Sequence, residues 1–76
     1  MKFLNKIKFF RQQKAITVKE LSKLSGVATG YISDLENENK NNPSTETMKR
    51  ISEALDQNII CVFFPEELNK GGMLNV

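Results

Sequence analysis

Side chains that can donate and accept hydrogen bonds are concentrated in residues 17–42 of this chain. Thr29 and Ser33 are four positions apart, so a helix would carry both hydroxyls on one face. Residues 37–42 add a run of Asn, Glu and Lys side chains. These groups are suited to binding a polar surface through hydrogen bonds.

Bond-making chemistry has little support in the sequence. The chain contains no His, and its single Cys61 lies inside an apolar run. It also lacks a phosphate-binding glycine loop and paired carboxylates on a concave scaffold. We therefore expect a chain that is not an enzyme, with no metal ion and no cofactor.

Length and composition predict one folded domain. The chain has 76 residues, of which 39% are hydrophobic and 26% charged, which is typical of a globular protein and too short for two domains. Lys and Asn interrupt the apolar residues near the start, so we expect no signal peptide and no membrane span. An unpaired cysteine then favours a reducing, cytoplasmic location.

Apolar periodicity and capping residues predict helices near the start of the chain. An amphipathic helix is expected over residues 4–14, and a second over residues 18–25. Thr17 and Glu20 have the spacing of a capping box, in which each side chain binds the other residue's backbone amide. Gly26 can adopt the left-handed conformation that ends such a helix.

The same signals continue further along the chain. A third helix is expected over residues 28–36 and a fourth over residues 45–55, the latter capped by Ser44. Residues 58–64 are rich in β-branched and aromatic side chains, which is compatible with a strand, but Asn58 can cap a short helix. We favour the helix and leave the strand open. Residues 65–76 are expected to be a flexible tail.

The second and third predicted helices have the features of a helix-turn-helix unit. Their close crossing needs a small side chain and a turn residue that tolerates positive φ, and Ser22 and Gly26 stand at these places. Leu21 and Leu24 are expected to face inward from the second helix. Further apolar groups that can close the crossing are Val27, Ile32 and Leu35.

These residues resemble the Cro/CI-type, or XRE-family, helix-turn-helix regulators of phages and bacteria. The resemblance covers roughly residues 4–64 and implies a compact all-α bundle of about five short helices, with residues 1–64 as the DNA-binding domain. It further implies a transcriptional regulator of double-stranded DNA, a repressor at a palindromic operator, whose third helix enters the major groove. The matching residues are Arg11, Thr17 to Ser22, Gly26, Val27, Tyr31 to Ser33, Leu35 to Asn37, Pro43, Ser44 and Ile51 to Leu55.

The resemblance also implies individual roles. Arg11 and Glu36 are expected to form an internal ion pair, and the position of Arg11 on an apolar stripe supports this, because an unpaired charge there would be costly. The alternative is an Arg11 side chain that extends its guanidinium to solvent. The residues implied to contact DNA are Thr17, Val18, Ala28, Thr29, Gly30, Tyr31, Ser33, Asp34, Asn37, Asn39, Lys40 and Asn42.

Three of these positions depart from the residues common in the family. Val18 can meet a thymine methyl, contact a sugar or simply be exposed. Gly30 is compatible with close approach to DNA or with an unconstrained surface position. Asp34 can accept from a cytosine amine or orient a neighbouring side chain.

The loop of residues 37–42 can bind phosphate or serve only as a turn.

A net charge of +2 is low for a DNA-binding domain, so we expect dimerisation to add affinity. Ile60, Phe63 and Phe64 are the predicted homodimer interface. They can instead complete the core of a single chain. A third alternative is an antitoxin or interaction module, in which this apolar segment binds a toxin, an antirepressor or another protein partner.

Overall fold

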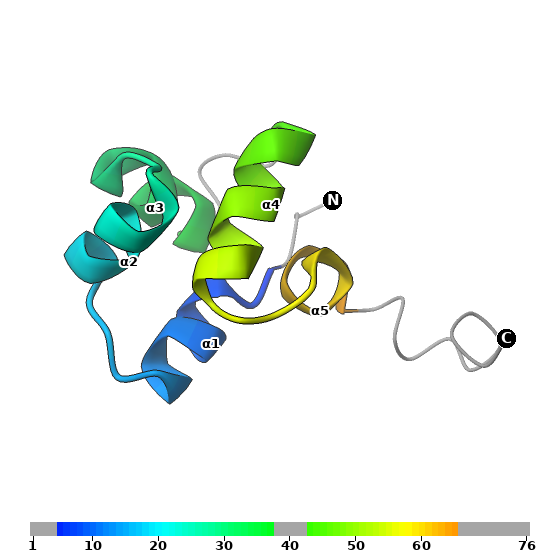
Figure 1. The fold of residues 1–76 in the computed structure, drawn as a ribbon, viewed down its shortest axis with the longest axis horizontal. Helices are drawn as coiled ribbons and strands as arrows, with labels where there is room; N and C mark the ends of the chain where they lie inside the picture. Colours follow the sequence, from blue (N-terminus) through cyan, green and yellow to red (C-terminus); the bar gives the residue numbers. More distant parts are fainter. Residues whose placement is uncertain (1–4, 38–42, 66–76) are drawn as a thin grey trace, which may run out of the picture.

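The computed structural model describes residues 5–37 and 43–65, and these residues form an all-α bundle (Figure 1). The predicted all-α class is confirmed, and the segment after Asn58 is a helix. The first helix begins later than predicted, at Ile7. In chain order the helices are α1 (Ile7–Gln13), α2 (Val18–Ser25), α3 (Thr29–Glu36), α4 (Thr45–Ala54) and α5 (Ile59–Phe63).

Local side-chain caps determine where three of these helices begin. At α2, the hydroxyl of Thr17 accepts from the amide of Glu20 at 3.0 Å, and the Glu20 carboxylate accepts from the amide of Thr17 at 2.8 Å. Ser44 caps α4 by accepting from the amide of Thr47, and Asn58 caps α5. Each cap satisfies an amide that has no partner inside its helix and contributes about 1 kcal/mol.

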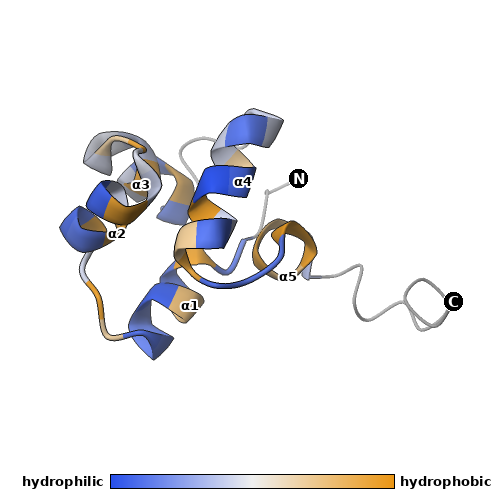
Figure 2. Ribbon diagram, viewed as in Figure 1, coloured by the Kyte–Doolittle hydropathy of each residue, from blue (hydrophilic) through white to orange (hydrophobic). Residues whose placement is uncertain are grey.

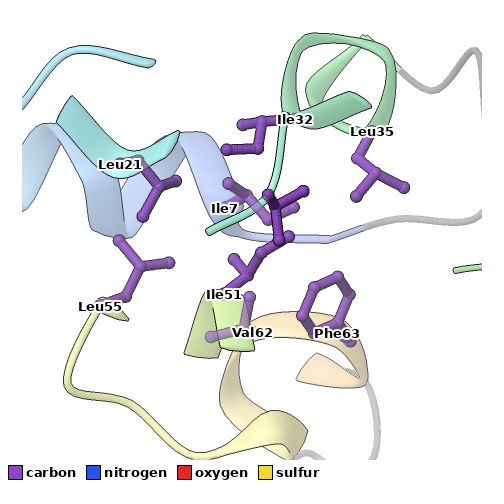
Figure 3. Close-up of a cluster of buried hydrophobic side chains, with 9 residues drawn as sticks. Ile7, Leu21, Ile32, Leu35, Ile51, Leu55, Val62 and Phe63 are labelled. Atoms are coloured by element: carbon purple, nitrogen blue, oxygen red, sulfur yellow. The ribbon is translucent and has the colours of Figure 1, made fainter. Parts of the chain in front are cut away.

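One hydrophobic core joins all five helices (Figure 3). The short α5 is coloured as hydrophobic along most of its length, whereas α4 carries hydrophilic residues on its outer side (Figure 2). Figure 3 shows side chains from α1 to α5 converging on the same space. The buried hydrophobic residues are Ile7, Leu21, Val27, Ile32, Leu35, Ile51, Leu55, Val62 and Phe63.

Two sequence predictions about apolar residues are wrong. Leu24 is not inward: it is 61% exposed, because the buried side of α2 is occupied by Leu21 and Ser25, one turn apart. Phe63 is only 1% exposed. Its ring fills the core of the single chain, so it is not available as an interface residue.

The described helices are short. None of them has both the length and the apolar character that crossing a membrane requires.

Candidate nucleic-acid interface

The corner between α2 and α3 is fixed by backbone geometry and by two serine hydroxyls. Gly26 ends α2 in the left-handed conformation, at φ 77°, as predicted. The Ser22 hydroxyl donates to the carbonyl of Val27 at 2.6 Å, and the Ser25 hydroxyl accepts from the amide of Val27 at 3.2 Å. Ser22 is therefore more than a small residue at the crossing, because its hydroxyl binds the chain just before α3.

An ion pair with α1 holds the C-terminal end of α3. Arg11 Nε donates to Glu36 Oε2 at 2.8 Å, and Arg11 Nη2 donates to Glu36 Oε1 at 3.1 Å. The two side chains are 14% and 6% exposed, so the predicted pair is present and largely shielded from water. Its hydrogen bonds raise the pKa of Arg11 above the ordinary value, against the opposing effect of burial. The guanidinium also donates to the carbonyl of Ile16 at 3.0 Å.

Held at both ends, α3 presents a polar face to solvent. Thr29, Ser33 and Asn37 follow one another at four-residue spacing, and the Asn37 amide donates to the Ser33 hydroxyl at 3.4 Å. Ser33 and Asp34 are half-buried. The predicted DNA-facing residues that are exposed are Thr17, Ala28, Thr29, Gly30 and Asn37.

Two of the predicted contact residues also have a structural role. Val18 and Tyr31 are half-buried and pack against the hydrophobic core, so only part of each side chain is available to a ligand. Gly30, by contrast, has no neighbour among residues 5–37 and 43–65 within 4 Å of the position that a Cβ would occupy. Packing within this described part of the chain therefore gives no reason for a glycine at this position.

The remaining predicted site residues fall into two groups. Asn39, Lys40 and Asn42 lie outside the described residues. Of the apolar residues assigned to an interface, Ile60 is half-buried and Phe64 is 40% exposed.

The sequence analysis missed two residues that support α3. Ser25 binds the turn before the helix, and Asn5 Nδ2 donates to the carbonyl of Leu35 at 2.9 Å near its end. A serine just before a turn glycine is a usable local signal for the first. No local signal exists for the second, because the partners are 30 positions apart.

Known proteins share both this sequence pattern and this arrangement of helices. HTH-type transcriptional regulator SinR from Bacillus subtilis (strain 168) and from Bacillus licheniformis are each 33% identical to the chain over 54 residues, which are 71% of this chain and 49% of the relative. The chain therefore spans about half the length of these relatives.

A solved structure extends the similarity to three dimensions. It is the N-terminal DNA binding domain of SinR from Bacillus subtilis, with a TM-score of 0.69 and 33% identity, and the match covers 71% of this chain and 78% of that one. The pattern of the Helix-turn-helix family matches residues 7–59, from the start of α1 to the start of α5. The chain belongs to the helix-turn-helix family.

Proposed function

We propose that this chain binds double-stranded DNA with sequence preference and regulates transcription, as a repressor acting at a palindromic operator in the cytoplasm. The observation that carries the proposal is the polar face of α3, exposed at Thr29 and half-buried at Ser33 and Asp34. A fixed corner and the pair of Arg11 with Glu36 hold this face outward. A helix presented in this way fits the major groove.

The proposed contacts divide by position. Thr29, the first residue of α3, and Ser33, one turn later, face base edges in this scheme, because side chains near the start of a recognition helix reach the bases. Thr17 and the first amides of α2 meet phosphate oxygens, for which a helix N-terminus is favourable. Residues 29–36 contain no Lys or Arg, so cations outside α3 must supply the attraction to phosphate. Lys40 is our proposed contact of this kind.

The active form is proposed to be a homodimer. Ile60 and Phe64 are the accessible members of the interface predicted from sequence, and Phe64 is an exposed aromatic side chain at the end of α5. A dimer adds the binding free energies of two half-sites, which compensates for the net charge of only +2. Half-sites one helical turn apart would then be about 34–36 Å apart.

Selection of bound duplexes from a random pool tests the DNA-binding proposal directly. We expect an enriched palindromic motif and a binding constant that falls steeply with salt, by about 0.9 logarithmic units per neutralised phosphate for each tenfold rise. Absence of enrichment, or affinity indifferent to salt, would contradict the proposal.

Two substitutions test the division of contacts. Thr29→Ala should relax the preference for particular bases, whereas Lys40→Ala should weaken binding to all duplexes alike and reduce the salt slope by about one. Identical behaviour of the two variants would contradict this division.

Sedimentation of the wild type and of Phe64→Ser tests the dimer. Loss of dimer and of operator affinity in the variant is expected. A wild type that is monomeric both alone and on a palindromic duplex would contradict the dimer and leave α5 open to a different protein partner.

A further inference from the structure

The segment just before α1 makes hydrogen bonds to α1, α3 and α5. Asn5 is half-buried, and its Nδ2 donates to the carbonyl of Leu35 in the last turn of α3 at 2.9 Å. Its Oδ1 accepts from the amide of Ile7 in the first turn of α1 at 3.1 Å. One carboxamide thus joins the beginning of α1 to the end of α3.

The backbone beside Asn5 is itself anchored. The amide of Lys6 donates to the carbonyl of Val62 in α5 at 2.7 Å, and Val62 is fully buried. Asn5 therefore projects from backbone that is anchored directly after it, at Lys6 by the bond to α5 and at Ile7 by the start of α1. Its side chain can hold α3 without first becoming ordered.

The bond to Leu35 adds a side-chain donor to a carbonyl at the end of α3, where the backbone amide of Asn37 also donates. The last four carbonyls of a helix have no amide partner within it, and Asn5 supplies a donor to one of them. The neighbouring residue, Glu36, is held by Arg11. Two adjacent residues at the end of α3 are thus tied to the α1 side of the fold by separate contacts.

Two attachments constrain a short helix in a way that one does not. The corner at Val27 fixes the beginning of α3, and the buried side chains of Ile32 and Leu35 hold its inner face. The second bond, at Leu35, opposes the small tilt of its end that these contacts and the ion pair still allow. An eight-residue helix is about 12 Å long, so a tilt of about 10° about the fixed corner moves its last turn by about 2 Å and Ser33, halfway along it, by about 1 Å. Recognition through hydrogen bonds tolerates displacements of only about 0.5 Å.

We propose that Asn5 is a positioning residue for DNA reading: its hydrogen bond to Leu35 sets the angle at which α3 presents Thr29 and Ser33 to the bases. The inference rests on the proposed function of α3. Asn5 itself contacts no base in this scheme. It acts through the backbone of the recognition helix.

Two uncharged substitutions distinguish the effects of the two hydrogen bonds of Asn5. Asn5→Ser keeps a short side-chain oxygen that can accept from the amide of Ile7, but its hydroxyl cannot extend to Leu35. Asn5→Ala removes both bonds. Ile51→Val is the matched control, because it removes one methylene from the core at α4 and leaves both hydrogen bonds of Asn5 in place.

The measurement is affinity for the selected operator and for an unrelated duplex, under conditions in which urea titration shows each protein to be more than about 99% folded. We expect both Asn5 variants to lose about tenfold in operator affinity, to keep affinity for the unrelated duplex within about twofold, and to retain the salt slope, because phosphate contacts are unchanged. Ile51→Val should bind the operator like the wild type.

Amide chemical shifts of the free proteins give a second readout that needs no DNA. The amide of Ser33 should shift in Asn5→Ser and stay in place in Ile51→Val. Wild-type operator affinity or unmoved α3 amides in Asn5→Ser would overturn the inference, as would an equal loss of affinity in Ile51→Val. A wild type that binds neither duplex, with the α3 amides shifted as expected, would instead refute the proposed function.

Discussion

Removing one partner of the ion pair between Arg11 and Glu36 should cost far more stability than removing both. The side chains are 14% and 6% exposed and are joined by two hydrogen bonds. Glu36→Leu leaves a guanidinium shielded from water without its carboxylate, and Arg11→Met leaves the carboxylate alone. Each single change should lower the free energy of unfolding by about 3 kcal/mol, the lower end of the range for buried pairs.

The double variant should recover most of this loss. Two apolar side chains of similar volume remove both desolvated charges. The stability loss that remains is that of the hydrogen bond from Arg11 to the carbonyl of Ile16, which is worth about 1 kcal/mol. The expected interaction energy is therefore several kcal/mol, well above the few tenths found for independent sites.

Urea unfolding followed by circular dichroism measures all four proteins. At about 0.05–0.15 kcal/mol per residue, a chain of 76 residues has a stability of about 4–11 kcal/mol, so a single variant can approach the unfolding limit. A fixed concentration of trimethylamine oxide, added to all samples, keeps the single variants folded. A double variant no more stable than either single variant would refute the pairing argument.

Three further predictions concern local strain and burial, each read from the thermal unfolding midpoint, which moves by about 4–8 °C per kcal/mol in a domain of this size. Ser52→Ala should stabilise by about 1 kcal/mol, because Ser52 is 1% exposed and its hydroxyl has no hydrogen-bond partner among the described residues. A lower midpoint would mean that the hydroxyl is paired. Ala15→Gly should stabilise by up to about 1 kcal/mol, since Ala15 has φ 57°, and an unchanged or lower midpoint would show that the backbone strain is smaller than the entropy cost. Gly26→Ala should destabilise by about 1–2 kcal/mol because Gly26 has a φ of 77°. Its control, Gly30→Ala, should stabilise by about 0.5–1 kcal/mol, because Gly30 lies inside α3. Equal midpoints for the two alanine variants would contradict the conformational argument.

Local signals predicted the elements of this fold well. Thr17 with Glu20, Ser44 and Asn58 are capping residues whose partners lie three positions away, so a short window of sequence contains the whole interaction. Gly26 was predictable for the same reason, because a left-handed turn depends on one residue. The all-α class follows from these caps and from apolar periodicity.

Errors arose where the outcome depends on packing between distant segments. Leu24 and Leu21 look equivalent in sequence, and only the placement of α3 and α4 against α2 decides that Leu21 is buried and Leu24 exposed. Phe63 and Phe64 are likewise adjacent and chemically identical, yet one fills the core and the other does not.

The candidate site likewise contains some contacts that the sequence indicated and others that depend on distant segments. Arg11 and Glu36 were expected as a pair because the family resemblance joined two positions that the residues alone leave 25 apart. Asn5 had no such guide. A single polar side chain before a helix gives no indication that its amide will bind a carbonyl at the end of another helix.

The contact between the first and last described helices determines when this domain can fold during its synthesis. Val62 and Phe63 from α5 complete the core around Ile7 of α1, and the amide of Lys6 binds the carbonyl of Val62. While a ribosome is still adding α5, the earlier helices have no completed core against which to pack. A nascent chain stalled before Val62 should therefore be readily cleaved by proteases, and protection should appear only after α5 has emerged from the exit tunnel.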